Sequence, residues 1–296
     1  MESKETKKGI LIAFIGALLI TPDTLFMRLS FMDVWTMLFW RGIQMGIVLI
    51  LITICIKEYR KKFKEIFTKT GIYIILSQAI GSIFFTYGVA TSSVALILLC
   101  IASSPLFASF FSYFLLKEKV KSSTIYASFF VIIGITISVL DAENAINIPD
   151  GNYVFGLVCG LITASTLGLN FVLLRSKPNI PAIGATGFGA LLTGLIGALF
   201  IQKINVFLGD LLAISISGII ILPLSFAALT YATRYTQAAN VSLLMLLETI
   251  LGPVWVWIII DETPTFQMIA GGMIVIFTLL IYFLYDICKN KYSFNT

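Results

Sequence analysis

The chain is divided into apolar runs of about 20 residues, which is the length that an α-helix needs to cross a bilayer. Only 12% of its residues are charged, against about 25% in soluble proteins, and the mean hydropathy is +1.00. In lipid the backbone must satisfy its own hydrogen bonds, so runs of this length predict helices and exclude the shorter strands of a membrane barrel. We therefore predict an all-α integral membrane protein with ten transmembrane helices, near residues 9–29, 34–56, 71–91, 94–116, 121–140, 153–174, 182–201, 209–233, 238–260 and 265–285.

The basic residues predict how these helices are oriented. With the N-terminus inside, the inner segments hold seventeen Lys and Arg residues and the outer segments hold two, Arg28 and Lys203. Cytoplasmic loops carry the excess of Lys and Arg, so we expect a multi-pass protein of the cytoplasmic membrane with both termini cytoplasmic. No small-residue cleavage site follows the first run, which is expected to be retained as a helix. Basic and aromatic residues alternate in 57–70, which could lie along anionic lipid or form only a basic inner loop.

The second half of the chain resembles the first. Ungapped shifts of 144 and 147 residues align Tyr87 with Tyr231, Glu118 with Glu262, Asp23 with Asn170 and Arg28 with Arg175. We predict two five-helix repeats, residues 1–140 and 153–296, joined by an outer linker at 141–152. Because five is odd, the second repeat would be inverted, an arrangement typical of secondary transporters with substrate near the bilayer midplane.

Several segments resemble the EamA-type carriers of the drug/metabolite transporter superfamily. They are FWRG at Phe39–Gly42, SSPLFASFFSYFLLKEKV at Ser103–Val120, LETILGPVWVWIIIDETPT at Leu247–Thr265 and GGMIVIF at Gly271–Phe277. The resemblance implies a ten-helix bundle of two inverted five-helix repeats with a central cavity, which moves small metabolites by alternating access. The chain departs from the family pattern at Asp261, where a small residue often precedes the glutamate, and at Pro22–Asp23.

Glu248 is the leading candidate for a functional residue, because it lies close to the centre of the apolar run 238–262. A carboxyl group in hydrocarbon is costly and is expected to face protein or water. It could exchange a proton during a transport cycle, pair with a cationic substrate, or serve only as a structural carboxyl bonded to a neighbouring helix.

Asp23 and Arg41 are expected at similar depths, about two turns below the outer ends of the first and second helices. A pair between them would remove two isolated charges from the bilayer, as a static clamp or as an outer gate. Alternatively, Arg41 could point into a cavity and bind a carboxylate of the substrate. Trp40 and Gln44 flank Arg41 at helical spacing, so these side chains cannot all face lipid.

Prolines 22, 105, 223 and 253 are expected to bend four helices and to free carbonyl groups that must face protein or water. Ser103 and Ser104, beside Pro105, are therefore candidates for a cavity lining, although a bend could also serve packing alone. Gly42-x-x-x-Gly46 and Gly156-x-x-x-Gly160 are expected to allow close helix packing.

The other candidates are neutral polar residues and residues at helix ends. Tyr87 and Tyr231 could form gates or only suit the membrane interface. Gln78, Asn170 and Asn240 could bind a substrate or another helix. Glu118 and Glu262, at helix exits, are interpreted as paired structural or gating anchors.

Together these features predict a carrier for a small, amphipathic, amino-acid-like metabolite, with proton coupling as one option and export favoured over import. The spans offer no histidine, no H-E-x-x-H and no G-x-S-x-G, so an intramembrane enzyme is the weaker alternative. A passive pore or a membrane sensor is the other. The four cysteines are isolated, so we expect no disulfide, metal or cofactor. The expected partners are the metabolite and the lipid bilayer, not nucleic acid, and the sequence leaves the oligomeric state open.

Overall fold

The computed structural model describes residues 2–117, 122–139, 153–177, 179–201, 207–232, 235 and 238–293, and all regular structure within them is helical. Seven helices are long and apolar enough to cross a membrane: Lys8–Leu29, Val34–Cys55, Lys69–Thr91, Val94–Leu116, Val154–Ser176, Ala182–Phe200 and Leu208–Ala232. Three shorter apolar helices lie at Tyr126–Ser138, Leu244–Ile260 and Phe266–Tyr282. The prediction of an all-α membrane protein is confirmed, whereas the count of ten spans stays a prediction. The linker at 141–152 and Glu118 lie outside the described residues.

The elements follow one another along the chain as short and long helices. They are α1 (Glu2–Ile20), α2 (Asp23–Leu29), α3 (Val34–Cys55), α4 (Lys57–Lys61), the 3₁₀ helix η1 (Phe63–Phe67), α5 (Lys69–Thr91), α6 (Val94–Ala102), α7 (Ser104–Leu116), α8 (Ser122–Val139), α9 (Tyr153–Ser176), α10 (Ala182–Phe200), α11 (Leu208–Ser215), the π-helical turn η3 (Ile216–Ile221), α12 (Leu222–Ala232), α13 (Ala238–Ile260) and α14 (Phe266–Ser293).

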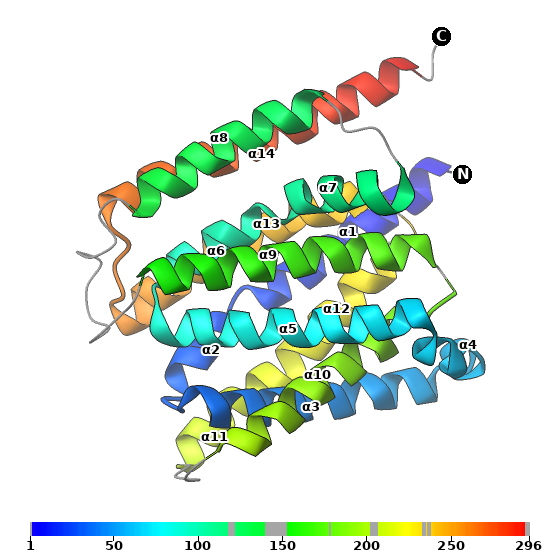
Figure 1. Cartoon of the computed structure of the whole chain (residues 1–296), viewed down its shortest axis with the longest axis vertical. Helices are drawn as coiled ribbons and strands as arrows, with labels where there is room; N and C mark the ends of the chain where they lie inside the picture. The colour runs from blue at the N-terminus through cyan, green and yellow to red at the C-terminus, as the bar shows by residue number, and fades with distance from the viewer. Residues whose placement is uncertain are drawn as a thin grey trace.

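The helices form one bundle in which elements of the two halves of the chain pack against each other. The pairs are α3 with α10, α5 with α9, α1 with α12, α6 with α13, and α8 with α14. The pair α8 and α14 lies along one side of the bundle, and α1 begins at the same end at which α14 finishes (Figure 1). Large apolar side chains remain on the outside, among them Leu51, Leu199 and Ile258, as expected for a surface that faces lipid.

Glycines allow the closest helix contacts. A Cβ atom at Gly42 of α3 would lie 2.5 Å from the backbone nitrogen of Gly194 on α10. A Cβ atom at Gly160 would lie 2.6 Å from the Cβ of Cys100, and Gly156 packs against Ser92. The packing role predicted for the two G-x-x-x-G motifs is therefore confirmed.

Three of the four prolines coincide with interruptions of a helix. Pro22 separates α1 from α2, Pro105 follows the break between α6 and α7, and Pro223 follows the π-helical turn η3. At the fourth, Pro253, α13 continues without a break, and the bend expected there stays a prediction. These breaks let short helical segments end inside the bundle, where their terminal groups can face polar side chains.

The basic segment after α3 folds back onto the bundle. Ile66 is fully buried in a cluster with Ile74 and Leu173, and the Phe63 ring packs against Phe188 at 5.8 Å between centroids. Much of the apolar face that could have met lipid therefore covers the end of the bundle.

Candidate functional site

A cavity of about 80 Å³ lies inside the bundle, between α1, α2, α3, α5, α6, α9, α12 and α13. Its polar lining includes Asp23, Arg41, Gln78, Ser82, Asn170 and Glu248, and the rest is largely apolar. Five of the residues proposed from the sequence therefore meet in one place, although they are far apart along the chain. A mostly apolar cavity with a few convergent polar groups is the usual form of a small-molecule site.

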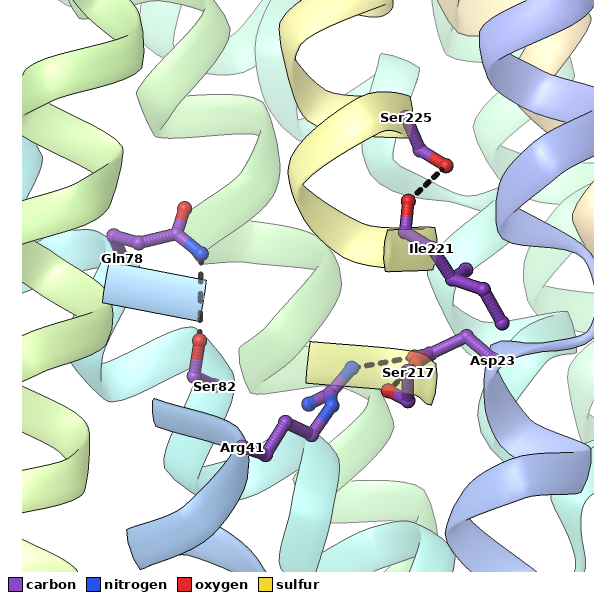
Figure 2. A network of polar contacts seen from close by, with 7 residues as sticks. All are labelled: Asp23, Arg41, Gln78, Ser82, Ser217, Ile221 and Ser225. Carbon is purple, nitrogen blue, oxygen red and sulfur yellow. Dashed lines mark hydrogen bonds and ion pairs between the residues drawn. The ribbon is translucent and has the colours of Figure 1, made fainter. Parts of the chain in front are cut away.

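Asp23 and Arg41 form a buried ion pair on one wall of this cavity. The second oxygen of Asp23 accepts a hydrogen bond from the Ser217 hydroxyl, so one carboxylate joins α2, α3 and η3 (Figure 2). The Arg41 guanidinium also lies 5.2 Å from the centre of the Phe85 ring. The two charges neutralise each other inside the bundle, and the sequence had left open whether they pair.

Local backbone structure brings these side chains together. Asp23 is the first residue of α2, directly after the interruption at Pro22. Ser217 lies on the π-helical turn, and such turns commonly occur at functional sites because they redirect side chains. Ser217 is not among the residues predicted from the sequence. The signal that could have indicated it is Pro223, which lacks the N–H needed for regular helical bonding just after this turn.

Ser217→Ala is expected to lower the free energy of unfolding by about 1.5–3 kcal/mol, because it removes a hydrogen bond to a buried charge. Thermal or denaturant unfolding of the purified protein in detergent would measure the loss. Ser225→Ala is the matched control, because the Ser225 hydroxyl donates 2.6 Å to the Ile221 carbonyl of its own helix (Figure 2). Equal losses in the two variants would contradict a special role for Ser217.

Glu248 lies near the middle of α13, is 6% exposed and lines the cavity. Among the described residues it has no hydrogen bond or ion pair, but the charges of Asp23 and Arg41 are close enough to act on it. Two hydrogen bonds join α13, the helix that carries Glu248, to neighbouring segments. Thr249 donates to the Leu98 carbonyl of α6 at 3.3 Å, and the Trp255 indole donates to the Thr21 hydroxyl at 3.1 Å.

Two amide side chains line another part of the cavity. The Asn170 amide nitrogen donates to the Gln78 side-chain oxygen at 3.2 Å, and the Gln78 nitrogen donates to the Ser82 hydroxyl at 3.3 Å. Figure 2 shows the contact between Gln78 and Ser82 separate from the cluster of Asp23, Arg41 and Ser217. The Asn170 side-chain oxygen is buried and accepts no hydrogen bond within the described residues.

Four other candidates lie beside the cavity rather than in its lining. Gln44 donates to the Ser215 hydroxyl at 2.7 Å, and Trp40 packs against an apolar cluster around Phe85. The Ser103 hydroxyl donates to the Cys100 carbonyl of its own helix, and Ser104 is buried at the start of α7.

The remaining candidates lie at helix ends or outside the described side chains. Tyr87 stacks edge-on against Trp35 at 5.2 Å, and the hydroxyl of Tyr231 lies 2.7 Å from that of Tyr235. Neither tyrosine is among the residues that line the cavity. The side chain of Asn240 lies outside the part of the chain whose side chains are described.

Glu262 joins three segments at one end of the bundle. Its carboxylate lies 3.1 Å from the Arg28 Nε and accepts the Val94 backbone N–H, at the start of α6, at 2.9 Å. The Arg28 guanidinium also donates to the Ser92 carbonyl at 2.7 Å. The preceding residue, Asp261, has φ 60°, a left-handed conformation that favours a small residue and that Asp tolerates better than most.

Many apolar helices around a mostly apolar cavity with a few convergent polar groups are the features of a multi-pass membrane transporter. The sequence matches the EamA-like transporter family over residues 7–140 and 154–284, and the chain belongs to this family. It is 24% identical over 217 residues to an uncharacterized transporter of Clostridium kluyveri, covering 70% of this chain and 68% of that protein. A solved crystal structure superimposes with a TM-score of 0.66 at 16% identity, covering 94% of this chain and 99% of the other, and it supports the fold alone. Family and relative point to a transporter rather than an enzyme.

Proposed function

We propose that the protein is a secondary active transporter that carries a small, amphipathic, amino-acid-like metabolite. The observation that carries this proposal is Glu248, a buried carboxyl that lines a mostly apolar cavity and has no ion pair among the described residues. A lone carboxyl there suits a proton or a cationic group that binds and leaves in turn. Transport coupled to protons, in the direction of export, would use this group once in each cycle.

The proposed mechanism is alternating access between two inverted five-helix repeats, residues 1–140 and 153–296. Helix bounds support it, since α6 and α7 together span Val94–Leu116 and α13 spans Ala238–Ile260, a shift of 144 residues. The residues that follow these two segments, Lys117 and Asp261, are also 144 residues apart. Both have a left-handed backbone conformation, with φ 57° and φ 60°.

The helix pairing supports the same organisation. Exchanging the two repeats converts the pair α1 with α12 into the pair α9 with α5, and returns the other three pairs to themselves. Such exchange is expected of two units related by a pseudo-two-fold axis. In this proposal all ten apolar segments cross the cytoplasmic membrane, with both termini on the cytoplasmic side.

Two ion pairs then have defined tasks. Asp23–Arg41 links α2, α3 and η3 at the cavity wall, and Arg28–Glu262 links α2 to the start of α6 at the end of the bundle assigned to the outside. We propose that the second pair anchors the outer ends of these helices and does not contact the substrate.

Purified protein in proteoliposomes is expected to exchange a labelled metabolite by saturable counterflow, and Glu248→Gln is expected to remove the pH dependence of that exchange. Screening a metabolite panel by thermal shift would supply the substrate, since a ligand of the folded state raises the melting temperature. Glu65→Gln, which neutralises an exposed carboxyl on η1, is the matched control and should behave as the wild type. Flux without counterflow would instead indicate a pore, and an unchanged pH dependence in Glu248→Gln would remove Glu248 from the mechanism.

A further inference from the structure

We infer that the cavity selects monovalent amine cations over zwitterions and anions, and that one proton and one amine compete for the same carboxyl group, Glu248. This inference rests on the proposed function and specifies its substrate class. It differs from a general amino-acid carrier because the carboxylate of the substrate has no assigned partner.

The charge of Arg41 is already balanced. Asp23 accepts from Arg41 through one oxygen and from Ser217 through the other, so the pair is neutral and Asp23 is fixed at both oxygens. The Arg41 Nε has no hydrogen-bond partner among the described residues. A substrate carboxylate that approached this nitrogen would nevertheless stand beside Asp23, with Glu248 also nearby, and would be repelled by both.

The charge of Glu248 is not balanced by a dedicated partner. Within the described residues no lysine or arginine pairs with it, and the charged side chains in the cavity lining are Asp23, Arg41 and Glu248. With all three ionised, the lining carries one net negative charge. A ligand with one positive charge restores neutrality in a site where an uncompensated charge is costly.

The unbonded oxygen of Asn170 points to the same class of ligand. Asn170 is 6% exposed, lines the cavity, and its side-chain oxygen has no donor within the described part of the chain. An ammonium group has several N–H donors and no acceptor, so it matches a cavity whose unpaired groups are a carboxylate and an amide oxygen. Phe85, Phe226 and Met245 in the lining offer apolar surface to the remainder of the molecule.

Competition between proton and amine follows from this arrangement. The charged groups that face Glu248 are Asp23 on α2 and Arg41 on α3. Four other helices pack on α13, namely α1, α6, α7 and α14, and their described side chains bring no charged group to the cavity lining. The thiol of Cys100 on α6 lies in the apolar core. A proton on Glu248 removes the charge that binds the amine, so exchange of one proton for one monovalent amine moves no net charge.

The test uses three probes with the same apolar body: phenethylamine, phenylalanine and 3-phenylpropionate. Calorimetric titration of the purified full-length protein in detergent is expected to detect binding of phenethylamine and weaker or no binding of the other two. As the pH is lowered through the titration of Glu248, the amine affinity is expected to fall by about tenfold per unit, and at higher pH to level off. Tighter binding of phenylalanine or phenylpropionate, or an affinity independent of pH, would overturn the inference.

Variants separate binding from folding. Glu248→Gln is expected to abolish amine binding and its pH dependence, and Asn170→Ala is expected to weaken binding while keeping the pH dependence. Glu65→Gln should bind as the wild type does. Amine binding retained by Glu248→Gln would overturn the inference; should that variant not fold, the pH dependence of the wild type and the effect of Asn170→Ala decide.

Counterflow in proteoliposomes distinguishes this inference from the transport function. Saturable counterflow of zwitterionic or anionic metabolites, with no exchange of amines, would overturn the substrate class and leave the transporter intact. Absence of counterflow for every solute in the panel would overturn both. Amine counterflow driven by an opposite pH gradient is the expected result.

Discussion

Arg41→Met is expected to lower the free energy of unfolding by about 3–5 kcal/mol, the usual loss when one partner of a buried ion pair is removed. The variant leaves Asp23 and Glu248 as two carboxylates in one cavity with no cation among the lining residues. Asp23→Asn is expected to cost less, because loss of the Asp23 charge leaves Glu248 able to ionise and to balance Arg41. Denaturant unfolding in detergent micelles would measure both losses.

A double variant and a second ion pair provide the controls. The double variant Asp23→Asn/Arg41→Met should be more stable than the Arg41→Met variant, because it has no unpaired buried carboxylate at position 23. Arg28→Met, which removes a partly exposed partner of Glu262, should cost less than Arg41→Met. Equal losses for Asp23→Asn and Arg41→Met would show that Glu248 does not compensate for Asp23.

Gly42→Val is the second change with a large expected effect. A Cβ atom at Gly42 would lie 2.5 Å from the Gly194 nitrogen and 2.7 Å from the Ala190 carbonyl oxygen, both backbone atoms of α10. Since backbone cannot rotate away, α3 and α10 must separate, and we expect a loss of at least about 1–3 kcal/mol, the usual cost of overpacking. Because α3 also carries Arg41, the same displacement should disturb the cavity.

Melting temperature in detergent and amine binding would both be measured for this variant. Gly209→Ala in α11 is the control for the loss of a glycine as such, because a Cβ atom there would meet nothing within 4 Å. Gly42→Ala is expected to be intermediate between that control and Gly42→Val. A Gly42→Val protein as stable as the wild type would contradict the close approach of α3 and α10.

The helical membrane fold could be predicted because it depends on properties that are local in sequence. Each apolar run must satisfy its own backbone in lipid, so run length alone predicts helices such as Val34–Cys55 and Ala182–Phe200 to within a residue or two. The effects of proline and glycine are also local in sequence. Pro22 and Pro105 coincide with helix breaks, and Gly42 lies at the contact of α3 and α10. Pro253 is the exception, since α13 stays continuous through it.

The candidate site could be predicted only in part. Asp23, Arg41 and Glu248 could be selected from the sequence, because a charged side chain in a membrane span is costly unless it faces protein or water. Ser217 was missed because serine is unremarkable in an apolar helix, and only the π-helical turn directs it to Asp23. Ser103 and Ser104 were chosen for the proline beside them, yet Ser103 bonds to its own helix and neither residue lines the cavity.

The class of fold and the short set of groups that could act can be predicted from the residues alone, since both follow from the energetics of single residues and single helices in a bilayer. Which of these groups meet depends on how the helices pack. Arg41 could have served a substrate carboxylate, but the approach of α2, α3 and η3 neutralises it with Asp23 and leaves Glu248 without a dedicated partner among the described residues. Pairing of charges depends on distances between helices far apart in the chain, and the order of residues does not contain those distances.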